Sequence, residues 1–319
     1  MKFTHNEILE HLSKTPLDEL MQTAYNVCEQ QFGNIIKIRG IIEFSNYCCC
    51  NCSYCGLRLD NTELTRYRLS NAQIFESAKK IHDHGISTVV LQSGEDSFYS
   101  DEDICNLVIK LKQKFLDLVI TLSIGERSLS AYQKFKAAGA DRYLLKHEAA
   151  NEQLYAKHHD QPHSKTRRQH LFWIKDAGLE TGTGFIVGLP HQTDLELAED
   201  ILFVQEFQPE MIGLGPFLSH HQTPLRNYKS GSIEKVLRCL ALVRLCVPHG
   251  NIPATTALAS LDHEFGLING IKAGANVVMC GFTPESERAN YKIYDNKDPI
   301  TLEKTLKIAE SLNKKLDLL

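Results

Sequence analysis

The sequence predicts an α/β protein, a TIM-type (β/α)8 barrel over residues 35–319 that follows a helical segment over residues 1–34. Eight strand-like apolar runs alternate with helical stretches, which is the order of elements that such a barrel needs. Glycines stand where four of the helical stretches should stop, at Gly85, Gly139, Gly178 and Gly274. Alternation alone does not show that a sheet closes, so an open doubly wound sheet remains the alternative.

The N-terminal segment is expected to hold two helices. Residues 1–12 have a helical pattern and carry acids, which excludes a secretory or transit peptide. Thr15 is expected to cap a second helix with Pro16 at its first helical position and Asp18 in its first turn. We expect this helix to pack against the barrel, and we assign it no catalytic role.

The barrel strands are expected in the apolar runs that follow. They are Lys37–Phe44, Thr88–Gln92, Val119–Ser123, Arg142–His147, Thr183–Val187, Met211–Leu214, Ile252–Thr256 and Asn276–Met279. Ser70 with Gln73, and Thr193 with Glu196, form capping boxes that open two of the intervening helices. Residues 299–319 are expected to form one amphipathic helix. Polar turns follow nearly every strand, and such turns in a barrel meet at one catalytic mouth.

A loop rich in cysteine directly follows the first expected strand. Cys48, Cys52 and Cys55 have the spacing C-x3-C-x2-C, so their thiolates can hold an iron–sulfur cluster with one iron left open. A structural zinc site is the alternative, but zinc needs four ligands and no second C-x2-C pair follows. Disulfides are not expected, because five cysteines in eight residues favour metal binding over pairing.

This motif resembles that of the radical S-adenosylmethionine (SAM) superfamily, and the rest of the chain resembles the HydE-type maturases of [FeFe]-hydrogenase. Biotin synthase and methylornithine synthase are relatives of that family. The matching stretches include RGIIEFSN, YCGLR, VLQSGED, TLSIGE, GADRYLLKHE, TGTGFIVGLP, IGLGPF and NIPATTA. The resemblance implies a full barrel, a [4Fe–4S] cluster and SAM bound to the open iron. It also implies reductive cleavage of SAM to a 5′-deoxyadenosyl radical that attacks a small, cysteine-derived and iron-bound substrate.

The resemblance also implies which residues hold SAM. They are Tyr54, Gly94, Glu95, Glu126, Arg142, Ile186, Val187 and Leu214. A glycine permits close backbone approach and an acid suits the ammonium group of SAM, which is consistent with Gly94 and Glu95. Arg142 is suited to bidentate capture of a carboxylate, of SAM or of the substrate. A surface ion pair, with Glu148 as one partner, is the alternative for Arg142.

The same resemblance assigns a substrate pocket to Gln92, Thr255, Thr256, Tyr291 and Tyr294. For the two tyrosines, a position in the core or on the surface is an equally good alternative to a position in the pocket. The glycine-rich run Gly182–Gly188 is not a phosphate loop, because it lacks both a G-K-[ST] ending and a G-x-G-x-x-G pattern before a helix.

Two features depart from the resemblance or are not explained by it. Cys49 and Cys50 fill the spacer of the motif, and no cysteine follows Cys280, so no auxiliary cluster is expected. The pairs His158–His159 and His220–His221 lie in polar stretches and are expected to be solvated; His220 matches a position of the family but has no assigned role.

Composition limits the partners. With 35 Lys and Arg against 39 Asp and Glu, the net charge is −4, which does not suggest a nucleic-acid partner. No apolar run is long enough for a membrane span, so a cytoplasmic enzyme is expected. We expect a ferredoxin or flavodoxin as electron donor and other hydrogenase maturases as further partners. The alternatives are a methylornithine-synthase-like enzyme with another amino-acid-derived substrate and a non-enzymatic Fe–S carrier.

Overall fold

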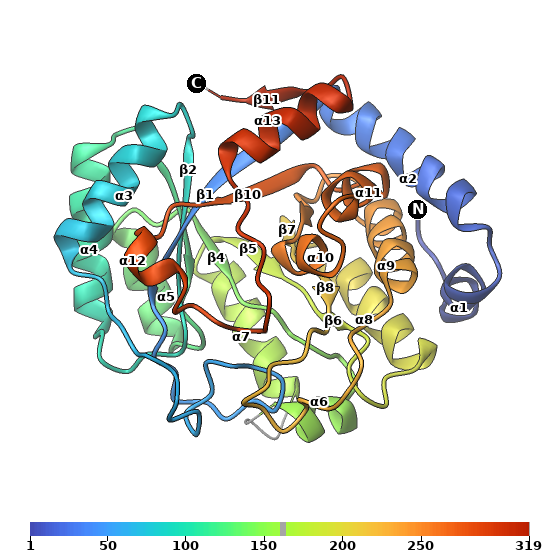
Figure 1. Ribbon diagram of the computed structural model, residues 1–319, viewed down its shortest axis with the longest axis horizontal. Coiled ribbons are helices and arrows are strands. Elements are labelled where there is room, and N and C mark those ends of the chain that lie inside the picture. The colour runs from blue at the N-terminus through green and yellow to red at the C-terminus, as the bar shows by residue number, and fades with distance from the viewer. Residues whose placement is uncertain (160–163, 319) are drawn as a thin grey trace.

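The computed structural model describes residues 1–159 and 164–318 and shows parallel strands surrounded by helices (Figure 1). The strands are β1 (Ile35–Ser45), β2 (Thr88–Ser93), β3 (Val119–Ser123), β4 (Arg142–Leu144), β5 (Glu180–Thr183), β6 (Ile186–Val187), β7 (Met211–Ile212), β8 (Gly215–Pro216), β9 (Pro253–Ala254), β10 (Val277–Gly281) and β11 (Lys315–Asp317). The helices are α1 (His5–Ser13), α2 (Leu17–Phe32), α3 (Asn71–Asp83), α4 (Asp101–Lys114), α5 (Leu129–Ala137), α6 (Glu152–His158), α7 (Ser164–Asp176), α8 (Asp194–Phe207), α9 (Ile233–Cys246), α10 (Thr256–Leu261), α11 (Gly266–Lys272), α12 (Glu285–Arg288) and α13 (Leu302–Ser311).

Eight parallel strands form the barrel. The hydrogen-bonded order is β7-β5-β4-β3-β2-β1-β10-β9, so both ends of this path must meet for the ring to close. They meet at a parallel bridge between Met211 and Asn251, where the amide of Ile212 donates to the carbonyl of Asn251 at 3.0 Å. The predicted barrel is therefore confirmed.

The fifth and sixth barrel strands are interrupted, which the sequence did not predict. β5 is followed by the separate short strand β6, β7 by the separate short strand β8, and β6 pairs with β8 outside the main ring. The interruptions coincide where Gly184 lies against Gly213, so closely that a Cβ on Gly184 would stand 1.8 Å from the Gly213 carbonyl oxygen. The predicted strand Arg142–His147 is also shorter and ends at Leu144.

The C-terminal segment is not the single helix that its pattern suggested. α13 ends near Asn313, whose φ of 52° is left-handed and incompatible with further helix. The chain then forms β11, which pairs in parallel with the start of β1. That expectation was therefore wrong for the last residues.

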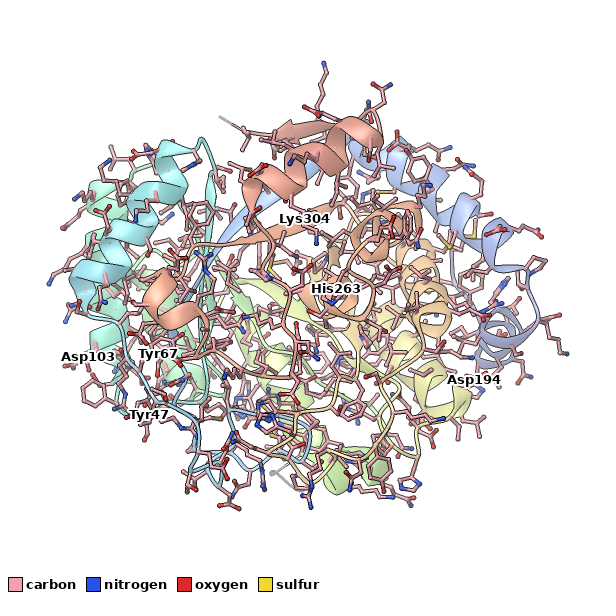
Figure 2. The ribbon with its side chains drawn as sticks, viewed as in Figure 1. Tyr47, Tyr67, Asp103, Asp194, His263 and Lys304 are labelled. Carbon is pink, nitrogen blue, oxygen red and sulfur yellow. The ribbon has the colours of Figure 1, made fainter. Side chains whose placement is uncertain are left out.

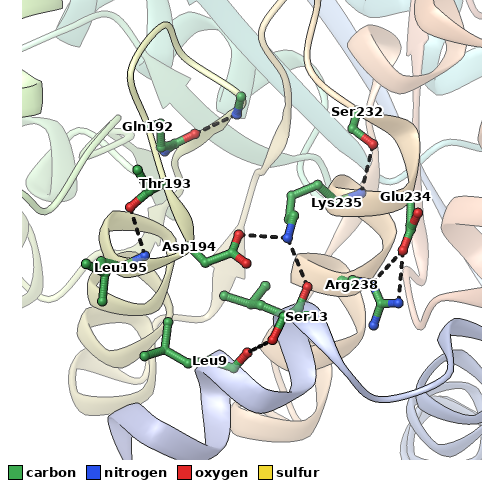
Figure 3. A network of polar contacts seen from close by, with 12 residues as sticks. Leu9, Ser13, Gln192, Thr193, Asp194, Leu195, Ser232, Glu234, Lys235 and Arg238 are labelled. Atoms are coloured by element: carbon green, nitrogen blue, oxygen red, sulfur yellow. Dashed lines mark hydrogen bonds and ion pairs between the residues drawn. The ribbon is translucent and has the colours of Figure 1, made fainter.

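The N-terminal helices lie on the outside of the barrel beside α8 and α9 (Figure 1). α2 buries Leu20, Ala24 and Cys28, as its apolar spacing predicts. Lys235 on α9 donates to Asp194 at the start of α8, at 2.7 Å, and to the carbonyl of Leu12 at 2.9 Å (Figure 3). This contact ties three helices together. The predicted Thr15 cap is wrong, because Pro16 occupies the N-cap position and no side chain caps the helix.

Within the described residues, none of the helices combines the length and the apolar character that crossing a membrane requires.

Candidate active site

A cavity of about 360 Å³ lies inside the barrel, within the size range of small-molecule sites. The cysteine loop and the ends of most barrel strands contribute to its lining. Thirteen of the residues expected at the site line it: Gln92, Gly94, Glu95, Cys48, Cys52, Tyr54, Cys55, Ile186, Leu214, Thr255, Thr256, Tyr291 and Tyr294. Residues far apart in sequence thus meet as the strand-end pattern predicted.

The cysteine loop is held by backbone hydrogen bonds at both ends. The amide of Cys49 donates to the carbonyl of Glu95 at 2.9 Å, and the amide of Gly56 donates to Ile293 at 2.7 Å. The Arg66 guanidinium binds the loop from outside, through the carbonyls of Asn46 at 2.6 Å and Leu57 at 2.9 Å. Arg68 stacks on Tyr47, 3.6 Å from its ring centre, and Tyr47 lies on the same side of the molecule as Tyr67 (Figure 2).

The three motif cysteines fit an iron–sulfur cluster. All ten cysteines lie in the described part of the chain and are free thiols, and Cys48, Cys52 and Cys55 share one cavity wall. Burial raises the pKa of Cys55, and the neighbouring sulfurs of Cys52 and Cys48 raise it further. Three cysteine sulfurs on the wall of one cavity are the donor set that an iron–sulfur cluster uses.

Gly94 allows the close approach between β2 and the cysteine loop. A Cβ on Gly94 would stand 2.3 Å from the carbonyl oxygen of Tyr47 and 2.7 Å from the Cβ of Cys48. Any larger residue would therefore push the first cluster cysteine out of place. Gly94, which was expected from the sequence to approach SAM, is thus also required for the position of the cysteine loop.

Arg167 joins two of the predicted acids. Its Nη1 donates to Glu95 and to Glu126, at 3.0 Å each, and its Nε donates to the carbonyl of Lys146 at 3.0 Å. Burial opposes the charge of Arg167, but the two carboxylates outweigh it and raise its pKa well above the ordinary value. Glu126 is not among the cavity-lining residues of the described chain; one of its carboxylate oxygens binds Arg167, and the other lies 3.4 Å from Nε2 of His170.

An apolar patch forms another part of the wall. Tyr54 packs against a small cluster that includes Ile186, Tyr155, Leu189 and Phe217. Such a surface suits the flat face of a purine. Val187 is fully buried and, among the described residues, is not part of the cavity lining, so its predicted contact with SAM is not supported by its position.

The predicted substrate residues meet at one side of the cavity. The Gln92 amide donates to the hydroxyl of Tyr291 at 3.0 Å, which fixes both side chains. The Thr255 hydroxyl accepts from the amide of Leu258 at 3.3 Å and so caps α10, while Thr256 and Tyr294 complete this wall. Both tyrosines are thus cavity residues; Tyr291 is buried and Tyr294 is half-buried.

The expected role of Arg142 is wrong. It is the first residue of β4 and, in the described chain, is not among the cavity-lining residues; its Nε donates to Glu180 at 2.5 Å. Its alternative, an ion pair, holds, but the partner is Glu180. Glu148 instead lies 3.0 Å from the ammonium of Lys146.

Several cavity residues were missed by sequence reasoning. They are Arg39, Glu43, Cys50, Arg167 and Lys297. Arg167 lies next to a second arginine in a polar helix, and no local signal distinguishes the two. The expectation that the histidine pairs are solvated is wrong for His158, His159 and His220, which are buried; only His221 of the four is exposed.

Comparisons with known proteins agree with this geometry. The family model of the radical SAM superfamily matches residues 42–204, which include the cysteine loop, Glu95 and Arg167. Over 299 residues the chain is 41% identical to the [FeFe] hydrogenase maturase subunit HydE of Thermotoga maritima, covering 93% of this chain and 85% of that protein. Over 284 residues it is 28% identical to 3-methylornithine synthase of Methanosarcina acetivorans, covering 89% and 80%.

Solved structures share the fold over almost the whole chain. Methylornithine synthase matches with a TM-score of 0.88 at 25% identity, covering 99% of this chain and 94% of that one. The FeFe-hydrogenase maturase HydG of Carboxydothermus hydrogenoformans matches with a TM-score of 0.83 at 20% identity, covering 99% and 76%, which bears on the fold alone.

Proposed function

This chain belongs to the radical SAM superfamily and is an enzyme of that superfamily, and we propose that it acts on a small, cysteine-derived, iron-bound substrate in maturation of the [FeFe]-hydrogenase active site. The observation that carries the proposal is the single cavity that joins the three cluster cysteines to the polar group around Gln92 and Tyr291. An electron donor such as ferredoxin or flavodoxin, and other maturases, would be its protein partners.

Each group of residues at the site has its own expected role. Cys48, Cys52 and Cys55 would hold a [4Fe–4S] cluster, which when bound supplies the electron that cleaves SAM to a 5′-deoxyadenosyl radical. Glu95 lies within reach of the cysteine loop, and its carboxylate would accept from the ammonium group of SAM. Arg167 holds that carboxylate in place through an ion pair of 3.0 Å. Tyr54, Ile186 and Leu214 would cover the nucleoside and exclude water from it.

The substrate assignment is supported by the relative that is 41% identical, whose name is a hydrogenase maturase. The pocket is small and offers hydrogen bonds from Gln92 and Thr256, which suits an amino-acid-sized ligand and leaves no room for a polymer. The competing proposal, another amino-acid-derived substrate, is favoured by the match to methylornithine synthase over 99% of the chain.

Cluster chemistry is tested by replacing single cysteines. Anaerobically reconstituted protein should bind about four irons per chain and cleave SAM when reduced. Cys52→Ser should abolish both, whereas Cys49→Ala and Cys50→Ala, its matched controls in the same loop, should retain the iron. Retention of cleavage by a folded Cys52→Ser protein, or loss of iron from a control, would contradict this ligand set.

The substrate is tested by maturation in vitro. The protein should restore hydrogenase activity to a maturation mixture that lacks its own HydE. A protein that cleaves SAM but never restores that activity would remove the hydrogenase role and leave the other amino-acid-derived substrate in its place.

A further inference from the structure

A second cavity of about 680 Å³ adjoins the first and lies under the chain between α12 and α13. Charged side chains of both signs line it, among them Glu285, Arg288 and Asp295. Glu43 and Lys297 line both cavities, and so does Tyr291. The wall between the two spaces is therefore made in part by one acid and one base.

Glu43 and Lys297 form an ion pair in this wall. The ammonium of Lys297 contacts Oε1 of Glu43, and the side chains are only 20% and 7% exposed, respectively. The second carboxylate oxygen of Glu43 accepts from the hydroxyl of Thr283 at 3.2 Å, so the acid is fixed on β1. Lys297 lies on a segment without helix or strand, with its ammonium 4.8 Å from the centre of the Tyr291 ring.

The pair stands at the level of the predicted substrate residues. Glu43 on β1 is in register with Gln92 on β2, and Gln92 donates to Tyr291, over whose ring Lys297 lies. Arg39, the other missed cation on this strand, is four residues earlier on β1, about 13 Å deeper in the barrel. Arg167 is already shared by two carboxylates.

We propose that the Glu43–Lys297 pair is the receptor for the α-amino and α-carboxylate groups of the substrate, which enters from the second cavity. The inference rests on the proposed function, because it concerns the ligand of the same site. The ligand ammonium takes the place of Lys297 at Glu43, and the ligand carboxylate takes the place of Glu43 at Lys297. The exchange keeps two opposite pairs and buries no unpaired charge, since a zwitterion carries both partners. A lysine on a segment without regular structure can move aside toward the second cavity, whereas an acid on a strand cannot.

The charge pattern of the site selects the ligand class. A ligand with only a carboxylate would leave Glu43 unpaired, and a ligand with only an amine would leave Lys297 unpaired. Each unpaired buried charge weakens binding by more than the lost contact alone. The pair therefore favours a complete α-amino acid, free or as part of an iron complex.

The test is calorimetric titration of reconstituted, SAM-loaded protein with three matched probes. They are S-methyl-L-cysteine, 2-(methylthio)ethylamine, which lacks the carboxylate, and 3-(methylthio)propionate, which lacks the amine. Wild type should prefer S-methyl-L-cysteine. Lys297→Met should lose about tenfold or more in affinity for S-methyl-L-cysteine and should no longer prefer it over the amine; Glu43→Gln should no longer prefer it over the acid.

Lys292→Met is the matched control, because Lys292 lines the second cavity and, in the described chain, not the first. It should bind all three probes like wild type. Absence of binding by wild type, equal losses for all three probes in Lys297→Met, or an equal loss in Lys292→Met would overturn the receptor. This test is distinct from the test of the proposed function. Restored hydrogenase maturation without a probe preference would contradict only the proposed receptor. A probe preference without restored maturation would contradict only the hydrogenase role.

Discussion

Arg167 donates to Glu95 at 3.0 Å across 72 residues of sequence. The same nitrogen reaches Glu126, so one buried cation sets the position of two acids, of which only Glu95 lines the cavity in the described chain. We therefore expect Glu126 to influence SAM binding through Arg167, whereas the sequence led us to expect a direct contact.

Replacing Arg167 should weaken SAM binding without removing the cluster. Arg167→Lys keeps the charge but cannot donate to both acids from a planar fork, and we expect at least a tenfold loss in SAM affinity. Iron content should stay unchanged, because no cysteine contacts Arg167 through a hydrogen bond in the described chain. Calorimetry on reconstituted protein measures both.

The control is Arg168→Lys, since Arg168 lies over the ring of Phe203 outside the cavity. It should bind SAM like wild type. The SAM affinity of Glu126→Gln should lie between those of Arg167→Lys and Arg168→Lys, because this change removes one of the two acids that bind Arg167. Equal affinities in all three variants would show that this ion cluster is only structural.

The sequence predicted local arrangements better than distant ones. The spacing of Cys48, Cys52 and Cys55 indicated the metal site because covalent connectivity alone keeps them together. Arg142 begins β4, as the expected strand Arg142–His147 has it, but its expected contact with SAM came from the family resemblance, and patterning does not show which side chains reach a cavity. The role of Arg167 depends on the contact of α7 with the turns that follow β2 and β3, and no short-range sequence pattern encodes that contact.

The same limit applies to the fold. Eight alternating strands predicted a parallel sheet with helices on its faces, but they left an open doubly wound sheet as the alternative, and the family resemblance favoured closure. The break between β5 and β6 was not predicted, since it depends on contact between Gly184 and Gly213 from two different strands. β11 was missed because its three residues pair with β1 only after the fold has formed.

Gly94→Ala should disrupt the cluster more than its size suggests. The new Cβ would stand 2.3 Å from the Tyr47 carbonyl oxygen, so either β2 or the cysteine loop must move. We expect poor iron incorporation and a loss of roughly 1–3 kcal/mol in unfolding free energy, the usual cost of overpacking. Iron analysis and denaturant titration measure these effects.

Gly281→Ala is the matched control, because a Cβ there has its nearest neighbour, the Ile300 carbonyl oxygen, at 4.0 Å. It should keep full iron content and near-native stability. If Gly94→Ala also loads four irons and unfolds like wild type, the close contact at Gly94 does not determine the position of Cys48.

His159 should make stability depend on pH. Burial lowers its pKa to about 3, whereas an exposed histidine has a value near 6.5. Between these values the unfolded chain binds a proton that the folded chain does not, so the contribution of His159 is present above pH 6.5 and is lost as pH falls toward 3. His159→Phe can keep the stacked contact with Tyr155, whose ring centre lies 4.5 Å away.

From pH 7 to pH 5 wild type should therefore lose about 2 kcal/mol more unfolding free energy than His159→Phe. Urea titrations at both pH values measure the difference between the two proteins. Parallel pH profiles would mean that His159 ionises in the folded protein as it does in water.

Tyr291→Phe should separate substrate binding from SAM cleavage. It removes the hydroxyl that accepts from the Gln92 amide at 3.0 Å and leaves that amide facing the cavity without its partner. The ring remains under Lys297, so the Glu43–Lys297 pair should be kept. Because the lost bond is neutral, we expect a loss of about 1 kcal/mol, or roughly fivefold, in affinity for S-methyl-L-cysteine. SAM affinity should not change, since Tyr54, Glu95 and Arg167 are untouched.

Tyr228→Phe, at an exposed tyrosine, is the control and should match wild type in both titrations. A parallel loss of SAM affinity in Tyr291→Phe would mean that the cavity has one shared site for both ligands, and that the polar group around Gln92 belongs to the SAM site.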